Sequence, residues 1–238
     1  MNEFINKKTE FIDLGLQDYK QAWDYQTSLL NATLAIKQTN RNLPVHSQQP
    51  TRNYLLFCEH PHVYTLGKSG DENNLLATKE KLSTLRATYY QTNRGGDITY
   101  HGPGQLVVYP VLDLENFFTD IHQYMRLLEE AVILTCRDYG LKAGRIEKLT
   151  GVWIDCEDPL QARKICALGV KTSRWVTLHG LALNVNTELS YFNHIIPCGI
   201  DNKAVTSMEK ELGRTTDIKE VGECLKRHLV TLFKMDLV

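Results

Sequence analysis

The sequence lacks any apolar run approaching the roughly 20 residues that a membrane-spanning helix requires. It also lacks an excess of positive charge, because 27 Lys and Arg residues against 28 Asp and Glu residues give a formal net charge of −1. Nucleic-acid binding proteins carry a basic footprint that this balance does not supply. The first residues contain no apolar segment followed by a small-residue cleavage site, so we expect no signal peptide and a cytoplasmic chain.

Cysteine is also scarce, and none of the six cysteines forms a C-x-x-C pair. A chain of 238 residues with so few cysteines does not resemble a disulfide-stapled scaffold, so we expect free thiols in a reducing compartment. Most free cysteines are small buried hydrophobic residues. The informative question is whether one of them is reactive instead.

The apolar spacing predicts helices on either side of a run of strands that do not alternate regularly with them. The expected helices are 17–37, 77–86, 121–139 and 218–232, with Gly140 ending the third one. The expected strands are 54–58, 88–92, 105–112, 150–155, 163–171 and 175–185. This order favours an α/β or α+β fold with a mixed sheet. Because the connections are short, we predict one domain over residues 1–238.

The most unusual segment is 94–105, which holds four glycines and a proline in twelve residues. Such a composition is not that of a plain strand or helix, and glycine lets a backbone approach a ligand closely. Arg94 adds a planar cation, and His101 adds a group that ordinarily titrates near neutral pH. The segment is either a loop that grips an acyl or phosphate-bearing substrate or a tight structural turn with a buried histidine.

Cys198 is the best candidate for a reactive thiol, because it lies between Pro197 and Gly199, where a bend exposes a side chain more readily than a smooth strand does. A nucleophilic cysteine must be ionised, so it needs a nearby cation or base. Lys164 is a candidate for that group. Cys166 competes as nucleophile, but it lies inside a regular β pattern and ranks lower.

Cys58, His60 and His62 occupy alternating positions and would share one face of a strand. A metal site there would need a fourth ligand at suitable spacing, and the sequence offers no obvious one. A turn at residues 60–62 that leads a loop into the site is the favoured interpretation, and no metal is expected.

Together these segments resemble the lipoyl(octanoyl) transferases of the biotin/lipoyl ligase superfamily. The resemblance runs from about residue 54 to 207 with its blocks in the same order. It rests on Glu59-His60-Pro61, on Tyr64-Thr65-Leu66-Gly67, on Arg94-Gly95-Gly96, on Thr99, on His101-Gly102-Pro103-Gly104-Gln105, on Tyr109, on Lys164, on Gly169, on His179-Gly180-Leu181-Ala182-Leu183-Asn184 and on Pro197-Cys198-Gly199.

The resemblance implies an acyltransferase in which Cys198 carries an octanoyl group as a thioester and Lys164 lowers the pKa of that thiol. It implies that three stretches line the acyl site, namely Arg94, Gly95, Gly96, Asp97, Ile98, Thr99, Tyr100 and His101, then Ala167, Leu168 and Gly169, and finally Gly180, Leu181 and Ala182. Glycine-rich walls suit a slender alkyl chain. Because a thioester is already activated, no ATP, metal or organic cofactor is implied.

The implied donor is octanoyl-acyl carrier protein, and the implied acceptors are lysines of the lipoyl domains of 2-oxoacid dehydrogenases and of the glycine cleavage H protein. Two alternatives remain open at this point. An ATP-dependent lipoate–protein ligase would share the fold but would not need Cys198. A non-catalytic module that only binds an acyl carrier would leave the thiol unused.

Overall fold

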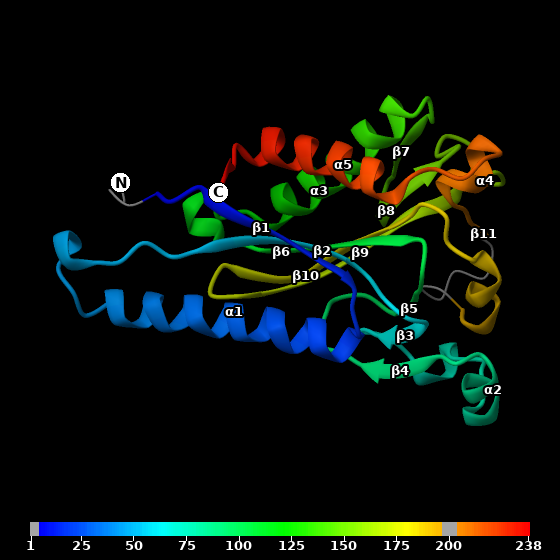
Figure 1. Ribbon diagram of the computed structural model, residues 1–238, viewed down its shortest axis with the longest axis horizontal. Helices are drawn as coiled ribbons and strands as arrows, with labels where there is room; N and C mark the ends of the chain where they lie inside the picture. The colour runs from blue at the N-terminus through cyan, green and yellow to red at the C-terminus, as the bar shows by residue number, and fades with distance from the viewer. Residues whose placement is uncertain (1–4, 197–203) are drawn as a thin grey trace.

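The computed structural model describes residues 5–196 and 204–238, and its largest element is a mixed β-sheet (Figure 1). The strands of this sheet are β1 (Lys8–Leu16), β2 (Asn53–Glu59), β6 (Gln105–Val111), β7 (Ala143–Ile146), β8 (Leu149–Ile154), β9 (Arg163–Ser173), β10 (Val176–Asn184), β11 (Ala204–Val205) and β12 (Asp236–Leu237). They lie in the order β12-β1-β2-β6-β10-β9-β8-β7, and β11 pairs with β9. Strand β1 runs parallel to β12 and β2, β11 runs parallel to β9, and the other pairs are antiparallel. The predicted mixed, mostly antiparallel sheet is confirmed.

A second, smaller sheet lies beside the large one and has the order β4-β3-β5. Its strands are β3 (Val63–Leu66), β4 (Thr88–Gln91) and β5 (Ile98–His101), and the short helix α2 (Lys79–Thr84) precedes β4. The two sheets are connected through β2 to β3 and through β5 to β6. The glycine-rich segment 94–105 contains β5 of the small sheet and ends at the first residue of β6 in the large sheet, so it lies at the junction of the two sheets.

Helices cover both faces of the large sheet (Figure 1). Helices α3 (Ile121–Asp138) and α5 (Ile218–Phe233) pack together on one face, and α1 (Tyr19–Asn40) covers the other. Helix α4 (Met208–Leu212) precedes α5, and 3₁₀ helices occupy Val45–Ser47, Glu72–Asn74, Leu114–Asn116 and Leu189–His194. Leu55 and Phe57 of β2 point toward the α3 and α5 side, whereas Leu56 and Cys58 point toward α1. Because both faces are covered, β2 is apolar on both, which explains its continuous hydrophobic run.

Side-chain caps account for where the long helices begin. Asp18, Asp120 and Asp217 each accept a hydrogen bond from a backbone N–H in the first turn of α1, α3 and α5 respectively. Gly140 follows α3 with φ of +80°, which confirms it as the glycine that ends this helix.

The sequence did not predict strands β1 and β3, and it treated β5 as part of an irregular loop. Strand β1 has only one fully buried residue, Thr9, so its pattern carries almost no period-2 signal. It forms because β2 and β12 flank it on both sides. Strand β5 is confined to Ile98–His101, and the glycines lie before and after it.

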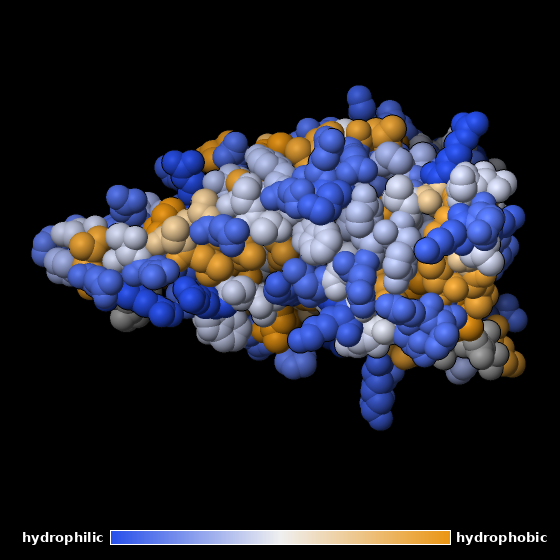
Figure 2. Space-filling view, turned by 90° about the horizontal axis from the view of Figure 1, so that it is seen from below, coloured by the Kyte–Doolittle hydropathy of each residue, from blue (hydrophilic) through white to orange (hydrophobic). Residues whose placement is uncertain are grey.

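Among the described residues, no helix combines the length and the apolar character needed to cross a membrane. Figure 2 views the molecule from the α1 side of Figure 1 and shows hydrophilic surface mixed with smaller hydrophobic areas. On this side, Lys20 and Asp24 form an exposed ion pair along α1.

Candidate active site

A cavity of about 580 Å³ lies between strands β9 and β10 of the large sheet and the loop that precedes β5. Its volume is in the usual range of small-molecule sites, roughly 300–1,000 Å³. Fourteen of the predicted site residues line it, namely Arg94, Gly95, Gly96, Asp97, Ile98, Thr99, His101, Lys164, Ala167, Leu168, Gly169, Gly180, Leu181 and Ala182. Segments about 70 to 90 residues apart in the sequence therefore meet at one cavity.

The two apolar triplets predicted at the acyl site are direct neighbours across the β9–β10 pair. Residues 167–169 face residues 182–180 one by one, so Gly169 lies opposite Gly180. A Cβ atom at Gly180 would lie 2.0 Å from the carbonyl oxygen of Val108, and one at Gly169 would lie 3.0 Å from that of Gly95. Gly180 has no room for a side chain, and at Gly169 the backbone of the neighbouring loop would have to move by a few tenths of an ångström. This part of the cavity wall is therefore backbone flanked by small or aliphatic side chains.

The loop before β5 is fastened to both sheets. The Arg94 guanidinium is buried and donates hydrogen bonds to the carbonyl oxygen of Thr65 at 2.6 Å and to its hydroxyl at 2.9 Å. The backbone N–H of Gly95 donates to the carbonyl oxygen of Val170 on β9 at 2.9 Å. The Asp97 carboxylate accepts from Asn74 at 2.6 Å. This loop is therefore a rigid wall of the cavity.

Two buried histidines line the cavity in their neutral form. Burial, together with the neighbouring ring of His60, lowers the pKa of His101 to about 3. Burial, together with the Arg94 charge, lowers the pKa of His179 to about 3. The expectation that His101 titrates near neutral pH is wrong, because a charged imidazole loses its hydration in this buried wall. Both rings act as fixed hydrogen-bonding groups.

His101 belongs to a chain of hydrogen bonds that crosses the cavity wall. Its Nδ1 lies 2.7 Å from the Gln105 side-chain oxygen, and the Gln105 amide donates to Asn184 at 2.8 Å. The Asn184 amide in turn donates to the carbonyl oxygen of Thr206 at 2.9 Å. The Gln105 oxygen accepts, so Nδ1 of His101 carries the proton. These hydrogen bonds connect residue 206, immediately after β11, to the motif around His101.

Tyr100 is the one predicted binding residue that does not line the cavity. It is fully buried in the small sheet, and its hydroxyl lies 2.7 Å from Nδ1 of His62. The ring of His62 stacks on Tyr191 with a centroid separation of 4.1 Å. His60 instead lies against Gln17 and Tyr109. Cys58 Sγ lies 3.5 Å from Nε2 of His60, whereas His62 has different partners, so the three side chains do not converge on one site.

Lys164 reaches the cavity from β9. Its Nζ lies 4.6 Å from the ring centroid of the buried Trp153, in the geometry of a cation–π contact. Gly151 leaves room for the lysine stem, because a Cβ there would lie 3.2 Å from Cε of Lys164. The carbonyl oxygen of Lys164 accepts a hydrogen bond from the backbone N–H of Thr206 at 2.9 Å. The ammonium is thus held on an aromatic face at the point where β11 joins the sheet.

Cys198 lies outside the described residues. The described residues on either side of the gap are attached close to the cavity. Ile196 donates its backbone N–H to Asn74, whose side chain contacts Asp97 of the cavity wall. After the gap, Val205 pairs with Lys164 and itself lines the cavity.

Cys166 is excluded as the nucleophile by its surroundings. It has no exposed surface, and its thiol lies 3.5 Å from the carbonyl oxygen of Ala167. Burial raises its pKa well above the ordinary value of a thiol. A thiol that stays protonated and does not reach the cavity cannot attack a bound thioester.

Tyr19 is a cavity residue that the sequence analysis missed. It begins α1, is buried, and stacks on the ring of His101 with a centroid separation of 5.9 Å and an interplanar angle of 12°. Burial raises its pKa to about 12. In the sequence it is only one apolar position of a helical pattern, and nothing there connects it with residues 80 positions away.

Comparison with known proteins agrees with this architecture. Residues 18–230 match the family model described as the lipoyl protein ligase A/B catalytic domain. An octanoyltransferase of Cytophaga hutchinsonii is 58% identical over 237 residues, covering 100% of this chain and 97% of the relative. An octanoyltransferase of Christiangramia forsetii is 58% identical over 234 residues, covering 98% of this chain and 99% of the relative.

Among solved structures, a bi-partite lipoate protein ligase of Thermoplasma acidophilum superimposes with a TM-score of 0.65. The superposition covers 97% of this chain and 86% of the ligase chain, at 19% sequence identity. At this identity the match is evidence of a shared fold alone. The family match and the high identity to the two octanoyltransferases go further. This chain belongs to the lipoyl protein ligase A/B catalytic domain family.

Proposed function

We propose that this chain is an octanoyltransferase of protein lipoylation that carries the acyl group as a thioester on Cys198. The relatives at 58% identity over nearly their full length bear the name octanoyltransferase, which supports octanoyl transfer as the activity and makes the chain an acyltransferase. Acyl carrier protein is the proposed donor, and a lysine of a lipoyl domain is the proposed acceptor.

The observation that carries this proposal is the paired arrangement of residues 167–169 and 180–182 beside Lys164 in one cavity. Backbone and small aliphatic side chains make a narrow apolar wall, and burying an alkyl chain against it contributes roughly 0.8 kcal/mol per CH₂. The Lys164 ammonium lies at the edge of that wall. This combination suits a long acyl chain whose reacting carbonyl carbon sits next to a cation.

The chemistry proceeds in two balanced steps. The Cys198 thiolate attacks the carbonyl carbon of the octanoyl thioester, a new C–S bond forms, and the bond to the carrier's pantetheine sulfur breaks. The leaving thiolate takes up a proton. The ε-amine of the acceptor lysine then attacks the enzyme thioester, the C–S bond to Cys198 breaks, and the amine loses a proton as the amide forms. Both steps start from an activated thioester, so they need no ATP.

In this scheme, the Lys164 ammonium favours the thiolate form of Cys198 by its positive charge. The Trp153 ring below it and the Gly151 backbone beside it limit where that ammonium can go. We propose that Arg94, Gly95, Gly96, Asp97, Ile98, Thr99, His101, Ala167, Leu168, Gly169, Gly180, Leu181 and Ala182 contact the bound acyl thioester. Tyr100 instead lies in the small sheet, with its hydroxyl 2.7 Å from Nδ1 of His62, and is not proposed to contact the substrate.

Protein partners of a lipoylation system follow from the family. We propose acyl carrier protein as donor, and the lipoyl domains of 2-oxoacid dehydrogenases and the glycine cleavage H protein as acceptors, in the cytoplasm. We also propose that residues 1–238 form one catalytic domain. Strands β1 and β12, which come from opposite ends of the described chain, pair in the large sheet and support this.

Intact mass spectrometry after incubation with octanoyl-acyl carrier protein tests the thioester. The parent chain gains one octanoyl group, which hydroxylamine at neutral pH removes, and Cys198→Ser gains none. Cys156→Ser is the control, because Cys156 is a partly exposed thiol that does not line the cavity. An adduct that persists in Cys198→Ser would refute the proposed carrier residue.

The same preparation separates this activity from a ligase. Octanoyl transfer to a lipoyl domain should proceed from acyl carrier protein without ATP and should be lost in Cys198→Ala. Transfer that requires ATP and free octanoate, and survives Cys198→Ala, would identify a lipoate–protein ligase instead. Binding of the acyl carrier without any adduct or transfer would identify a non-catalytic module.

The role of Lys164 is tested by thiol alkylation. Iodoacetamide should modify Cys198 at neutral pH several-fold more slowly in Lys164→Ala than in the parent, because the thiolate fraction falls. Lys148→Ala is the control, since Lys148 also lines the cavity but has an 88% exposed side chain. Equal rates in parent and Lys164→Ala would contradict the role.

A further inference from the structure

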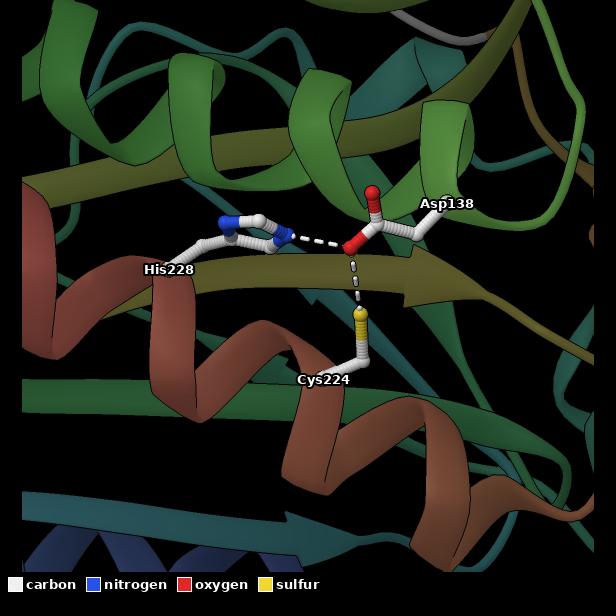
Figure 3. Close-up of side chains that lie close together, drawn as sticks. All are labelled: Asp138, Cys224 and His228. Atoms are coloured by element: carbon white, nitrogen blue, oxygen red, sulfur yellow. Dashed lines mark hydrogen bonds and ion pairs between the residues drawn. The ribbon is translucent and has the colours of Figure 1, made fainter.

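Three side chains with metal-binding chemistry meet on the face of the molecule where α3 and α5 pack together (Figure 3). The Oδ2 atom of Asp138 lies 3.3 Å from Sγ of Cys224 and 2.7 Å from Nε2 of His228. All three candidate ligand atoms lie within 4.8 Å of one another. None of these residues lines the acyl cavity.

The helical repeat explains why the three side chains converge. Cys224 and His228 are four residues apart on α5, so they lie one above the other on one face of that helix. Asp138 is the last residue of α3, which packs against α5. Figure 3 shows the carboxylate entering between the thiol and the imidazole from the opposite helix.

We propose that Asp138, Cys224 and His228 form a binding site for a divalent transition-metal ion of the zinc type. Thiolate, imidazole and carboxylate are the three ligand classes that zinc accepts in proteins. With bond lengths of about 2.0–2.3 Å, two ligands in a tetrahedral shell lie roughly 3.3–3.8 Å apart. The thiol–carboxylate separation of 3.3 Å already fits. The imidazole must move away from the carboxylate by about half an ångström to reach such a spacing.

The exposure of the cluster permits this adjustment. The side chains of Asp138 and His228 are 39% and 20% exposed, whereas Cys224 is only 4% exposed as a residue. The buried sulfur is therefore a fixed ligand. The imidazole of His228 and the carboxylate of Asp138, which lie on the solvent side, can change position to suit the ion. Water completes the coordination shell from that side.

The surrounding charges also tolerate the ion. Arg137 and Arg227 lie close enough to Asp138 and Cys224, respectively, to interact with them electrostatically, and both would oppose a bare dication. A divalent ion bound by one thiolate and one carboxylate forms a neutral centre, so the two guanidinium groups do not face a net positive charge. Glu220, one turn before Cys224, adds negative charge nearby.

The arrangement does not resemble a catalytic thiol site. In a nucleophilic cysteine site, a base takes the proton of the thiol and a third group orients the base. Here Asp138 is the common partner of both other groups. The Cys224 thiol is buried and donates to the Asp138 carboxylate, so it is not presented to a substrate as a nucleophile. A bound ion would instead join the end of α3 to α5 and stabilise the fold.

Cobalt(II) spectroscopy on the full-length, EDTA-treated and dialysed chain tests the site. The parent should bind one Co²⁺ with a sulfur-to-cobalt charge-transfer band and tetrahedral d–d bands, and Zn²⁺ should displace it. The thiolate band should disappear in Cys224→Ser, and the Kd for Zn²⁺ should rise at least about 10-fold in His228→Gln and in Asp138→Asn. Cys156→Ser and Cys198→Ser, each removing a different thiol, should keep both signals.

Thermal unfolding supplies a second readout. Saturating Zn²⁺ should raise the Tm of the parent, because the ion binds only the folded arrangement of the two helices, and should not raise that of His228→Gln. If Cys224→Ser does not fold, the partly exposed His228 still decides the question. A thiolate band that is absent in the parent, or one that survives Cys224→Ser and disappears in Cys198→Ser, would overturn the proposal.

Discussion

Replacing Asn184 with alanine should disable acyl transfer far more than it destabilises the fold. Asn184 lies at the end of β10 and is buried. Its amide donates to the carbonyl oxygen of Thr206 at 2.9 Å, and its oxygen accepts from Gln105 at 2.8 Å. Thr206 follows β11, which the chain enters directly after the segment that holds Cys198.

The expected loss of stability follows from two broken hydrogen bonds and two partners left behind. Each bond contributes about 1 kcal/mol net, and an unsatisfied buried partner costs about 1–3 kcal/mol. The Gln105 amide keeps a contact with the carbonyl oxygen of Tyr100 at 3.2 Å, whereas the Thr206 carbonyl oxygen loses its side-chain donor. We therefore expect a loss of about 2–4 kcal/mol, which corresponds to about 4–16 °C in Tm for a chain of this size.

The effect on activity should be larger, because the segment after Cys198 loses the hydrogen bond that Asn184 donates to the carbonyl oxygen of Thr206. A displacement of about 1 Å at a reacting group costs on the order of 10²-fold in rate. The assay is octanoylation of Cys198 by octanoyl-acyl carrier protein, followed by intact mass spectrometry well below the Tm of the variant. We expect the rate of Asn184→Ala to fall at least about 10-fold.

Asn186→Ala is a closely matched control. Asn186 lies two residues further along and also makes two side-chain hydrogen bonds, a donated one of 2.7 Å and an accepted one of 3.1 Å, both with the backbone of Thr216. Neither bond involves residue 206, so Asn186→Ala should lose stability but keep a rate within about 2-fold of the parent. Equal acylation rates in the two variants would refute the anchoring role of Asn184.

Two further predictions concern packing and pH. Gly180→Ala should lower the free energy of unfolding by more than about 3 kcal/mol, because its Cβ would lie 2.0 Å from a carbonyl oxygen of β6. Gly222→Ala in α5 meets only contacts of 3.6 Å or more and should raise the free energy of unfolding by about 0.5–1 kcal/mol. Chemical denaturation measures both changes, and a Gly180→Ala variant as stable as the parent would contradict this reasoning. The folded-state pKa values of His60, His101 and His179 are about 4, 3 and 3, below the unfolded value, so the unfolded chain binds more protons below pH ~6.5. The free energy of unfolding should therefore fall as the pH drops from about 6.5 toward 4, by up to about 4 kcal/mol per pH unit. In urea titrations at several pH values, His179→Gln should reduce that slope by about a third. An unchanged slope would show that His179 does not stay neutral in the fold.

Much of the fold could be predicted from the sequence because its strongest elements carry their own signal. Helices α3 and α5 show apolar residues at helical spacing, and Gly140 ends the first of them as expected. Strand β2 is apolar throughout because both faces are buried. Strand β1 could not be predicted, since its pairing with β2 and β12 supplies what its own pattern lacks.

The candidate site was predicted largely through the resemblance of its motifs to a family, and the structure brings those motifs together at one cavity. Residues 167–169 and 180–182 each look like ordinary β-strand sequence. Their one-to-one pairing becomes visible only in the register of β9 and β10. The neutral state of His101 was also out of reach, because the burial that lowers its pKa comes from surrounding elements.

By itself, the sequence determined the fold class, the amphipathic helices, the continuous central strands and the residue types available for acyl chemistry. These depend on local spacing and composition, which a linear chain displays directly. Only the tertiary structure decided that Tyr19 stacks on His101, that Tyr100 turns away from the cavity, and that Asp138 meets Cys224 and His228. Such contacts join residues far apart in the chain, and they follow from helix packing and strand register, which no local pattern encodes.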